Sequence, residues 1–210
     1  MSSFDPTCRA CPRLAHHLEE VRQCYPDYHA RPVAAFGDPQ ARLLIVGLAP
    51  GMHGANASGR PFTGDFAGIL LYQTLYDFGF SNAPVSQALD DGLRLKNCRI
   101  TNAVKCLPPA NKPTTVEINT CNSYLQAELQ ELASGSVVLA LGVVAHRAVL
   151  RALRLKQATY RFAHGKHYRL PDDHHLLDSY HCSRYNTQTK RLTQRMFRLV
   201  FTKAARLLAT

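Results

Sequence analysis

The chain has 210 residues, of which 46% are hydrophobic and 19% are charged. These proportions exclude a disordered chain, a collagen-like repeat and a long coiled coil. The 25 Lys and Arg residues outnumber the 15 Asp and Glu residues, which gives a formal charge of +10. Such a charge makes nucleic acid the leading candidate partner, and a basic surface that only maintains solubility is the alternative.

No stretch of the chain is apolar over the ~18 residues that a transmembrane helix needs. The opening residues, MSSFDPTCRACPRL, include an acidic Asp5 and lack the apolar stretch of a secretory signal. We therefore expect a cytoplasmic protein that is associated with the nucleoid and contacts no membrane.

Hydrophobic patterning predicts strands and helices that alternate along the chain. A short amphipathic helix over 13–24 comes first, and an extended connector over 25–39 follows it. Strands are then expected at 43–48, 99–104, 136–142 and 175–180, and helices at 66–78, 115–133, 143–153 and 192–208. In the last helix the expected apolar face consists of Leu192, Met196, Leu199, Val200 and Leu207, and the opposite face carries Arg191, Arg195, Arg198 and Arg206.

This alternation implies an α/β fold, with a parallel sheet that is covered by helices on both faces. Sheets of this kind bind ligands beyond the carboxyl ends of their strands. We therefore look for functional residues directly after the first, second and fourth strands.

The segment after the first strand runs from Gly47 to Asp65 and is rich in glycine. Its exposed backbone N–H groups lead into a helix start, an arrangement that favours anions, although the segment matches neither a Walker A loop nor GxGxxG. Phe62 is an aromatic residue outside any helical or strand periodicity. Asp65 is a candidate catalytic carboxylate, and a simple helix cap is the structural alternative.

The other two segments add polar side chains at strand ends. Asn102 ends the second strand, where its amide offers both a donor and an acceptor to a base edge, or else a strand-end hydrogen bond. His181 ends the fourth strand and is a candidate site residue, with packing as the alternative. The polar residues that follow it suit contact with DNA phosphates or insertion into a duplex. They are Ser183, Arg184, Tyr185 and Asn186.

Seven cysteines, at positions 8, 11, 24, 98, 106, 121 and 182, occur in this chain. Their odd number and the reducing cytosol argue against a disulfide framework. Cys8 and Cys11 form a CxxC pair, and Cys106 and Cys121 form a second pair about a hundred residues later. Four thiolates can close a metal site, and their spacing suits zinc as well as an iron–sulfur cluster.

Three motifs, in order, resemble those of the iron–sulfur uracil-DNA glycosylases of type b, also called family 5. They are GLAPG with NASGRPFTGD, then NAVKCLPPANKP, and finally HCSRYN. The resemblance extends over nearly the whole chain. It implies a single three-layer domain over 1–210, in which a four-stranded parallel sheet lies between helices. It also implies a monofunctional enzyme of base excision repair that removes uracil from DNA by hydrolysis.

The same resemblance implies roles for individual residues. Asp65 would position a water molecule and stabilise the cationic sugar, and Phe62 would stack on the base. Asn102 and His181 would make polar contacts to the base, and at Gly51 the backbone would approach it. Because Leu48 and Ala49 stand where related enzymes place a polar water-activating residue, the resemblance also implies a tolerant pocket. Such a pocket would accept hypoxanthine, xanthine or ethenocytosine.

For the cysteines, the resemblance implies a [4Fe–4S] cluster held by Cys8, Cys11, Cys106 and Cys121. We interpret the cluster as a structural clip, and we expect Cys24, Cys98 and Cys182 to be ordinary small buried side chains. Cys182 departs from the proline or valine that we expect in the family. We expect a monomer that acts on DNA containing uracil or other deaminated bases, and a contact with a sliding clamp stays open. The alternatives are a non-catalytic nucleic-acid-binding module and a redox carrier.

Overall fold

A computed structural model describes residues 4–209 and contains one mixed sheet of six strands. The strands are β1 (Phe36–Gly37), β2 (Leu43–Gly47), β3 (Cys98–Asn102), β4 (Val137–Leu141), β5 (His167–Arg169) and β6 (His175–Ser179). Their order across the sheet is β1-β3-β2-β4-β6-β5. The inner pairs β3–β2, β2–β4 and β4–β6 are parallel, whereas β1 and β5 pair antiparallel at the two edges.

The expectation of a four-stranded, wholly parallel sheet is therefore corrected. The four inner strands lie where the sequence predicts them, but two short edge strands make the sheet mixed. β1 has two residues and β5 has three, and neither is long enough to show a period-two pattern. β1 lies inside the segment that we expected to be an extended connector.

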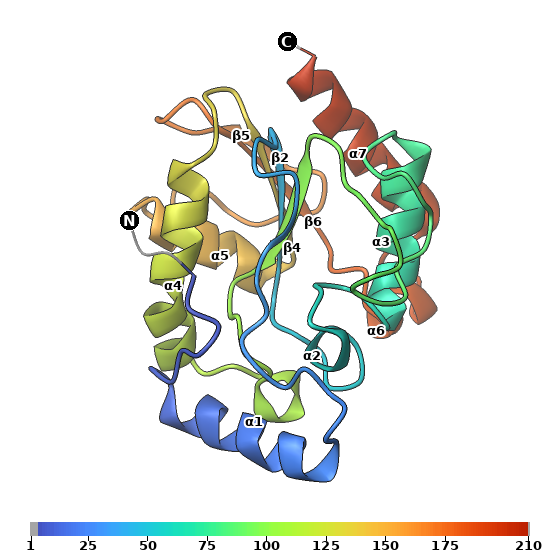
Figure 1. Ribbon diagram of the computed structural model, residues 1–210. Coiled ribbons are helices and arrows are strands. Elements are labelled where there is room, and N and C mark those ends of the chain that lie inside the picture. The colour runs from blue at the N-terminus through green and yellow to red at the C-terminus, as the bar shows by residue number, and fades with distance from the viewer. Residues whose placement is uncertain (1–3, 210) are drawn as a thin grey trace.

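The helices are α1 (Pro12–Cys24), α2 (Ala55–Ser58), α3 (Phe66–Asp77), α4 (Thr115–Gln130), α5 (Val143–Ala152), α6 (Arg184–Gln188) and α7 (Gln194–Leu208), together with the 3₁₀ turn η1 (Pro109–Asn111). In Figure 1, α4 and α5 cover one face of the sheet, α3 and α7 cover the other, and α1 lies across the lower end. No helix within residues 4–209 combines the length and the hydrophobicity needed to cross a membrane.

Alternating side chains of the strands explain the two helical layers. Leu43 and Ile45 of β2 point into the core under α3 and α7, and Leu44 and Val46 point into the core under α4 and α5. Successive side chains of a strand face opposite sides, so a strand that is covered on both faces must be apolar throughout. All five residues of β2 are buried, as the continuous apolar run predicts.

The last helix differs from its predicted form. α7 begins at Gln194, and the side chain of Thr193 caps it by accepting a hydrogen bond from the Met196 N–H at 3.2 Å. Its buried face is formed by Phe197, Val200, Phe201 and Ala204. Leu199 is 60% exposed, so its assignment to the apolar face is wrong. The two phenylalanine rings occupy the buried face and turn Leu199 outward.

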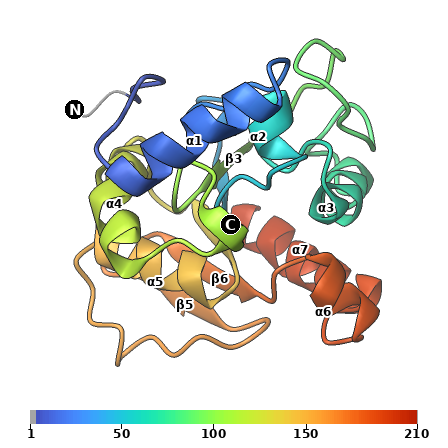
Figure 2. The same ribbon diagram turned by 90° about the horizontal axis from the view of Figure 1, so that it is seen from below.

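The carboxyl ends of the inner strands meet at the lower edge of the sheet in Figure 1 and face the viewer in Figure 2. From β2 the chain proceeds to β3 on one side, and β4 lies on the other. The strand order therefore reverses at β2, and a crevice is expected at that point.

Candidate active site

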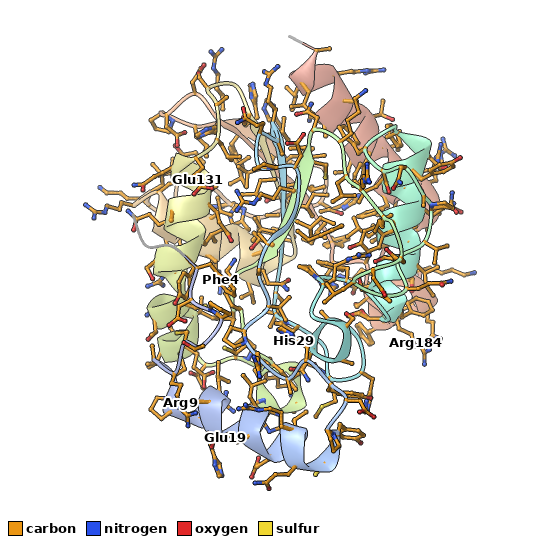
Figure 3. All side chains as sticks on the ribbon, viewed as in Figure 1. Phe4, Arg9, Glu19, His29, Glu131 and Arg184 are labelled. Atoms are coloured by element: carbon orange, nitrogen blue, oxygen red, sulfur yellow. The ribbon has the colours of Figure 1, made fainter. Side chains whose placement is uncertain are left out.

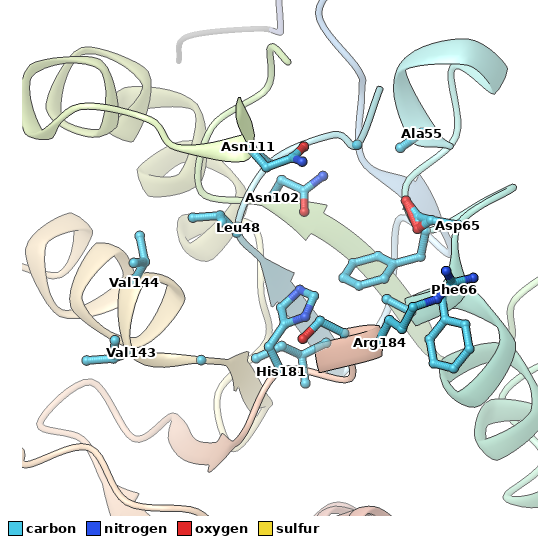
Figure 4. Close-up of a pocket in the computed structure, with 17 residues that line it drawn as sticks. Leu48, Ala55, Asp65, Phe66, Asn102, Asn111, Val143, Val144, His181 and Arg184 are labelled. Carbon is cyan, nitrogen blue, oxygen red and sulfur yellow. The ribbon is translucent and has the colours of Figure 1, made fainter. Parts of the chain in front are cut away.

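A cavity of about 510 Å³ opens at this edge of the sheet, between the segments that follow β2, β3, β4 and β6 (Figure 4). It brings together the five predicted base-contacting or catalytic residues, which are Gly51, Phe62, Asp65, Asn102 and His181. Ser183 and Arg184 also line it. The other two residues of the predicted DNA-binding loop do not.

Those two residues belong to α6, a one-turn helix in a stretch that we predicted to be a polar loop. Tyr185 is 69% exposed. The side-chain amide of Asn186 donates a hydrogen bond to the His181 carbonyl oxygen at 2.8 Å. Asn186 thus holds the backbone of a cavity residue, and Tyr185 projects from the surface.

The carboxylate of Asp65 is turned into the cavity. Asp65 occupies the N-cap position of α3, yet its side chain makes no capping hydrogen bond. A Cβ placed on Gly51 would lie 3.3 Å from Asp65 Oδ2, and one on Gly54 would lie only 2.5 Å from it. The glycine-rich loop is therefore folded closely around this carboxylate. The simple helix cap, which was the structural alternative, is not what the side chain does.

Burial raises the pKa of Asp65 above its usual value, and a hydrogen bond from the Ala55 backbone N–H opposes that shift. Burial lowers the pKa of His181 to about 4. The imidazole of His181 is therefore neutral at physiological pH, and one of its nitrogens can donate a hydrogen bond.

Phe62 is held in a strained conformation beside His181. Its φ of 58° is in the left-handed region, which an aromatic residue rarely adopts. The two rings stack with their centroids 5.8 Å apart and 26° between their planes. On α3, a Cβ at Gly68 would collide with the Phe62 carbonyl oxygen, so glycine is needed inside this helix. The Tyr72 hydroxyl fixes the turn from the other side by donating to the Pro61 carbonyl oxygen at 2.7 Å.

A buried arginine, Arg60, also holds the turn that contains Pro61 and Phe62. Arg60 is 2% exposed and forms an ion pair with Asp91 at 2.8 Å. It also donates to the Ser86 hydroxyl at 2.9 Å and to the Leu89 carbonyl oxygen at 2.7 Å. The Thr63 hydroxyl lies 2.6 Å from the same Ser86 hydroxyl. The segment around residues 86–91 therefore fastens the glycine-rich segment in place, a contact that no local pattern in the sequence indicates.

Asn102 and Asn111 form the opposite wall of the cavity (Figure 4). Asn102 is buried, and within residues 4–209 its Oδ1 accepts no hydrogen bond. The missing side chain of Gly47 gives this oxygen its space. Sequence reasoning did not select Asn111. The only clue in the sequence is that Asn111 is an asparagine within the proline-rich loop. In the structure it adopts a φ of 56°, which asparagine tolerates better than most residues.

Arg184 lies at the mouth of the cavity and projects from the surface in Figure 3. Its guanidinium lies 5.0 Å from the centroid of the Phe66 ring. This stacking directs an exposed positive charge to the cavity entrance, and one face of the guanidinium stays engaged with the ring.

The four cysteines of the predicted metal site line a second, smaller cavity of about 90 Å³ between α1, α4 and the loop after β3. They are Cys8, Cys11, Cys106 and Cys121. In the part of the chain that the structure describes, no three His, Cys, Asp or Glu side chains converge as the ligands of a single metal ion would. The four thiols line the small cavity together with neighbouring side chains. Of the remaining cysteines, Cys98 and Cys182 are buried as expected, but Cys24 is exposed at the end of α1, so that expectation is wrong.

A buried ion pair lies beside the cysteine cavity, and its Lys105 is one of the residues that line it. The ammonium group of Lys105 lies 2.7 Å and 2.9 Å from the two carboxylate oxygens of Glu128, and it also donates to the Thr101 hydroxyl. The backbone N–H of Lys105 donates to the sulfur of Cys121 at 3.2 Å. Lys105 is 1% exposed, and the Glu128 carboxylate compensates for the burial of its ammonium group. Sequence reasoning did not single it out.

Comparison with known proteins decides the family. The family model of the uracil DNA glycosylase superfamily matches residues 34–205. The chain belongs to this superfamily. A type-5 uracil-DNA glycosylase of Thermus thermophilus is 49% identical over 95% of this chain and 93% of that protein. A type-5 uracil-DNA glycosylase of Pyrobaculum aerophilum is 40% identical over 94% of this chain and 88% of that protein.

The type-4 uracil-DNA glycosylase of Archaeoglobus fulgidus is 32% identical over 74% of this chain and 71% of that protein. Within the superfamily, similarity to the type-5 members is therefore both higher and more extensive. The family indicated by the three motifs is confirmed.

Proposed function

We propose that this protein is a monofunctional DNA glycosylase that flips uracil out of DNA and hydrolyses its bond to deoxyribose. The observation that carries the proposal is the cavity itself. A carboxylate that does not cap its helix, a neutral imidazole, an aromatic ring and an unpaired amide oxygen face the same space. Membership of the uracil DNA glycosylase superfamily supports the choice of substrate.

The chemistry divides the site into two sides. As the glycosidic bond breaks, positive charge develops on the sugar and the bonding electrons leave with the base. Asp65, when ionised, balances the cationic sugar and orients the water that adds to C1′. His181 donates a hydrogen bond to a carbonyl oxygen of the departing base, where negative charge accumulates. The base leaves as an anion and takes up a proton after release, while the water that adds to C1′ gives up one proton to solvent, so the overall hydrolysis is balanced.

Recognition of uracil would fall to the opposite wall and to the stacked ring. The side-chain amide of Asn102, whose buried Oδ1 accepts no hydrogen bond within the described chain, would pair with the polar edge of uracil. Phe62 would stack on the flipped base. Leu48, Ala49 and Ala55 add an apolar wall without functional groups that would reject other bases. We therefore propose that hypoxanthine, xanthine and ethenocytosine are also substrates.

We further propose that Cys8, Cys11, Cys106 and Cys121 hold a [4Fe–4S] cluster. The donor set fits, because thiolates are the ligands of such clusters and all four cysteines line one cavity. When bound, the cluster supplies a covalent link between the N-terminal segment and the α4 region. Iron and sulfide analysis of purified protein, with absorbance near 400 nm, separates this proposal from a zinc site.

The test of the function is incubation with a labelled duplex that contains one uracil. A monofunctional glycosylase leaves an abasic site, so we expect the strand to break only after treatment with alkali. Cleavage before alkali would show an additional lyase step. Binding of the duplex with no excision would support the non-catalytic nucleic-acid-binding module instead.

A further inference from the structure

Three ring side chains form a compact group on the surface beside the candidate active site. We call this group, which consists of Tyr25, Tyr28 and His53, the aromatic platform. The two tyrosine rings stack with their centroids 4.6 Å apart and 15° between their planes. The Tyr28 hydroxyl lies 2.9 Å from Nδ1 of His53, and the His53 ring meets Tyr25 edge-on at 5.5 Å. The platform is thus held rigidly by its own contacts.

The contacts hold all three rings, and Tyr25 and His53 remain exposed to solvent. Tyr28 is partly buried against the core beneath α1. Tyr25 lies on top of it, is 40% exposed, and its hydroxyl makes no hydrogen bond within residues 4–209. A tyrosine that is fixed in position but only half covered offers ring surface to a partner at little cost in side-chain entropy.

The platform is continuous with the rim of the large cavity. His53 stands between Gly51 and Ala55, which both line that cavity. The backbone after Tyr28 also hydrogen-bonds to α2, because His29 and Ala30 donate to the carbonyl oxygens of Ala57 and Asn56 at 3.0 Å. Figure 3 shows His29 beside α2, and Figure 2 shows the end of α1 next to α2 on the face where the strands end.

We propose that the aromatic platform stacks on a base of the DNA strand next to the flipped nucleotide. This inference rests on the proposed function, because extrusion of one nucleotide removes a stacking partner from its neighbours. Aromatic rings bind unstacked bases of any sequence through their faces. The exposed Arg22 and Arg31 flank the two tyrosines of the platform in the chain and supply positive charge for the adjoining phosphates.

The experiment uses the full-length protein and a duplex that contains 2′-fluoro-deoxyuridine, which resists excision, flanked by 2-aminopurine. The chain contains no tryptophan, so the 2-aminopurine signal is read without interference. We expect the protein to quench this fluorescence at one flanking position through stacking. Tyr25→Ala should abolish the quenching and weaken binding about 5- to 150-fold. Tyr25→Phe should retain both, because the ring remains.

Two further variants test whether the Tyr25 ring stacks on a DNA base or only packs against its neighbours in the protein. Tyr76→Ala removes a tyrosine that is 47% exposed at the far end of α3, and it should change neither signal. Tyr25→Leu retains apolar bulk against Tyr28 but removes the ring. If it melts at a higher temperature than Tyr25→Ala but binds DNA as weakly, the result supports stacking on a base.

Full binding and quenching by Tyr25→Leu or Tyr25→Ala would overturn the inference. Excision of uracil by the unmodified protein is measured in parallel. If excision occurs while the Tyr25 variants bind and quench normally, only the platform fails. Absence of excision would contradict the proposed function itself.

Discussion

Asp65 experiences two opposing influences at the start of α3. The helix N-terminus favours a negative charge, and the Ala55 N–H donates to the carboxylate, yet burial among apolar walls disfavours ionisation. The raised pKa shows that burial outweighs the hydrogen bond. A carboxylate in this situation interacts strongly with a nearby cation, because little water screens it.

Replacement of Asp65 by Asn tests that role. We expect excision of uracil to fall by about 10²–10³-fold, because one electrostatic partner of the transition state is lost. DNA binding should persist, and the melting temperature at pH 7 should not fall, because the buried charge is removed. Single-turnover excision and thermal unfolding measure both effects. Phe62→Ala is the comparison, with slower base capture but an intact carboxylate. Unchanged excision by Asp65→Asn would remove Asp65 from the mechanism.

The pH dependence of excision follows from the pKa values of Asp65 and His181. In the proposed mechanism Asp65 acts in its ionised form, so the rate should be full above its pKa and should be lost as the pH falls through that value. Since burial raises this pKa above 3.8, the loss should begin at a higher pH than for an exposed aspartate. His181 stays neutral until the pH approaches about 4. Single-turnover rates measured from pH 4 to 8 check this expectation. Any residual rate of Asp65→Asn should not show the loss of activity at low pH that protonation of Asp65 causes.

At the scale of elements, α3 and the glycine-rich turn are coupled through Gly68. Alanine is usually more favourable than glycine inside a helix by about 1 kcal/mol. Here a Cβ would collide with the Phe62 carbonyl oxygen, so Gly68→Ala should lower the melting temperature and slow excision. Ile69→Ala, at the exposed neighbouring position, is the control and should do neither. A more stable Gly68→Ala variant would show that the turn moves freely.

The cysteine cavity joins α1 to α4, and a second prediction belongs to this junction. We expect Cys106→Ser to lose iron and to melt at a lower temperature, because one missing thiolate opens the proposed cluster site. Cys24→Ser is the matched control, because Cys24 is exposed and lies away from the cavity. Iron content and melting temperature are measured for both variants. Equal iron in the two would contradict the ligand assignment.

The long elements could be predicted from the sequence because their apolar residues recur with a clear period. α2, α6 and η1 could not, because each is a single turn that its tertiary contacts hold in place. The positions of the cavity residues followed from the rule that ligands bind at strand ends. The orientation of Asp65 did not, because it depends on how Gly51 and Gly54 fold around the carboxylate. Likewise, only the fold brings Tyr25 next to His53.

At the scale of the whole molecule, the positive charge is not equally available to DNA. Arg198 of α7 pairs with Asp77, and Arg191 stacks over the Tyr180 ring at 4.7 Å. In Figure 1 the C-terminal end of α7 lies at the opposite end of the molecule from α2 and α6. Arg184 at the cavity mouth is therefore better placed to contact DNA than the basic face of α7.

The salt dependence of DNA binding tests this distribution. Arg184→Ala should reduce the magnitude of the negative slope of log K against log salt concentration by about 0.9, the value of one lost phosphate contact. Arg206→Ala, near the far end of α7, removes the same charge and should leave the slope unchanged. Binding of a short duplex between 50 and 200 mM salt measures both variants. Equal slopes for the two would show that the charge acts only as a diffuse field.

The origin of the four cavity cysteines also has a consequence for the synthesis of the chain. Two of them lie within the first eleven residues, and the last is Cys121, so the set is complete only after more than half of the chain has left the ribosome. At about 5–20 residues per second, the first pair waits roughly 5–20 s for its partners. During that interval Cys8 and Cys11 are thiols of a nascent chain, open to oxidants and to other metals. If the four cysteines hold the proposed cluster, a reducing environment is therefore needed already during translation, before the fold is complete.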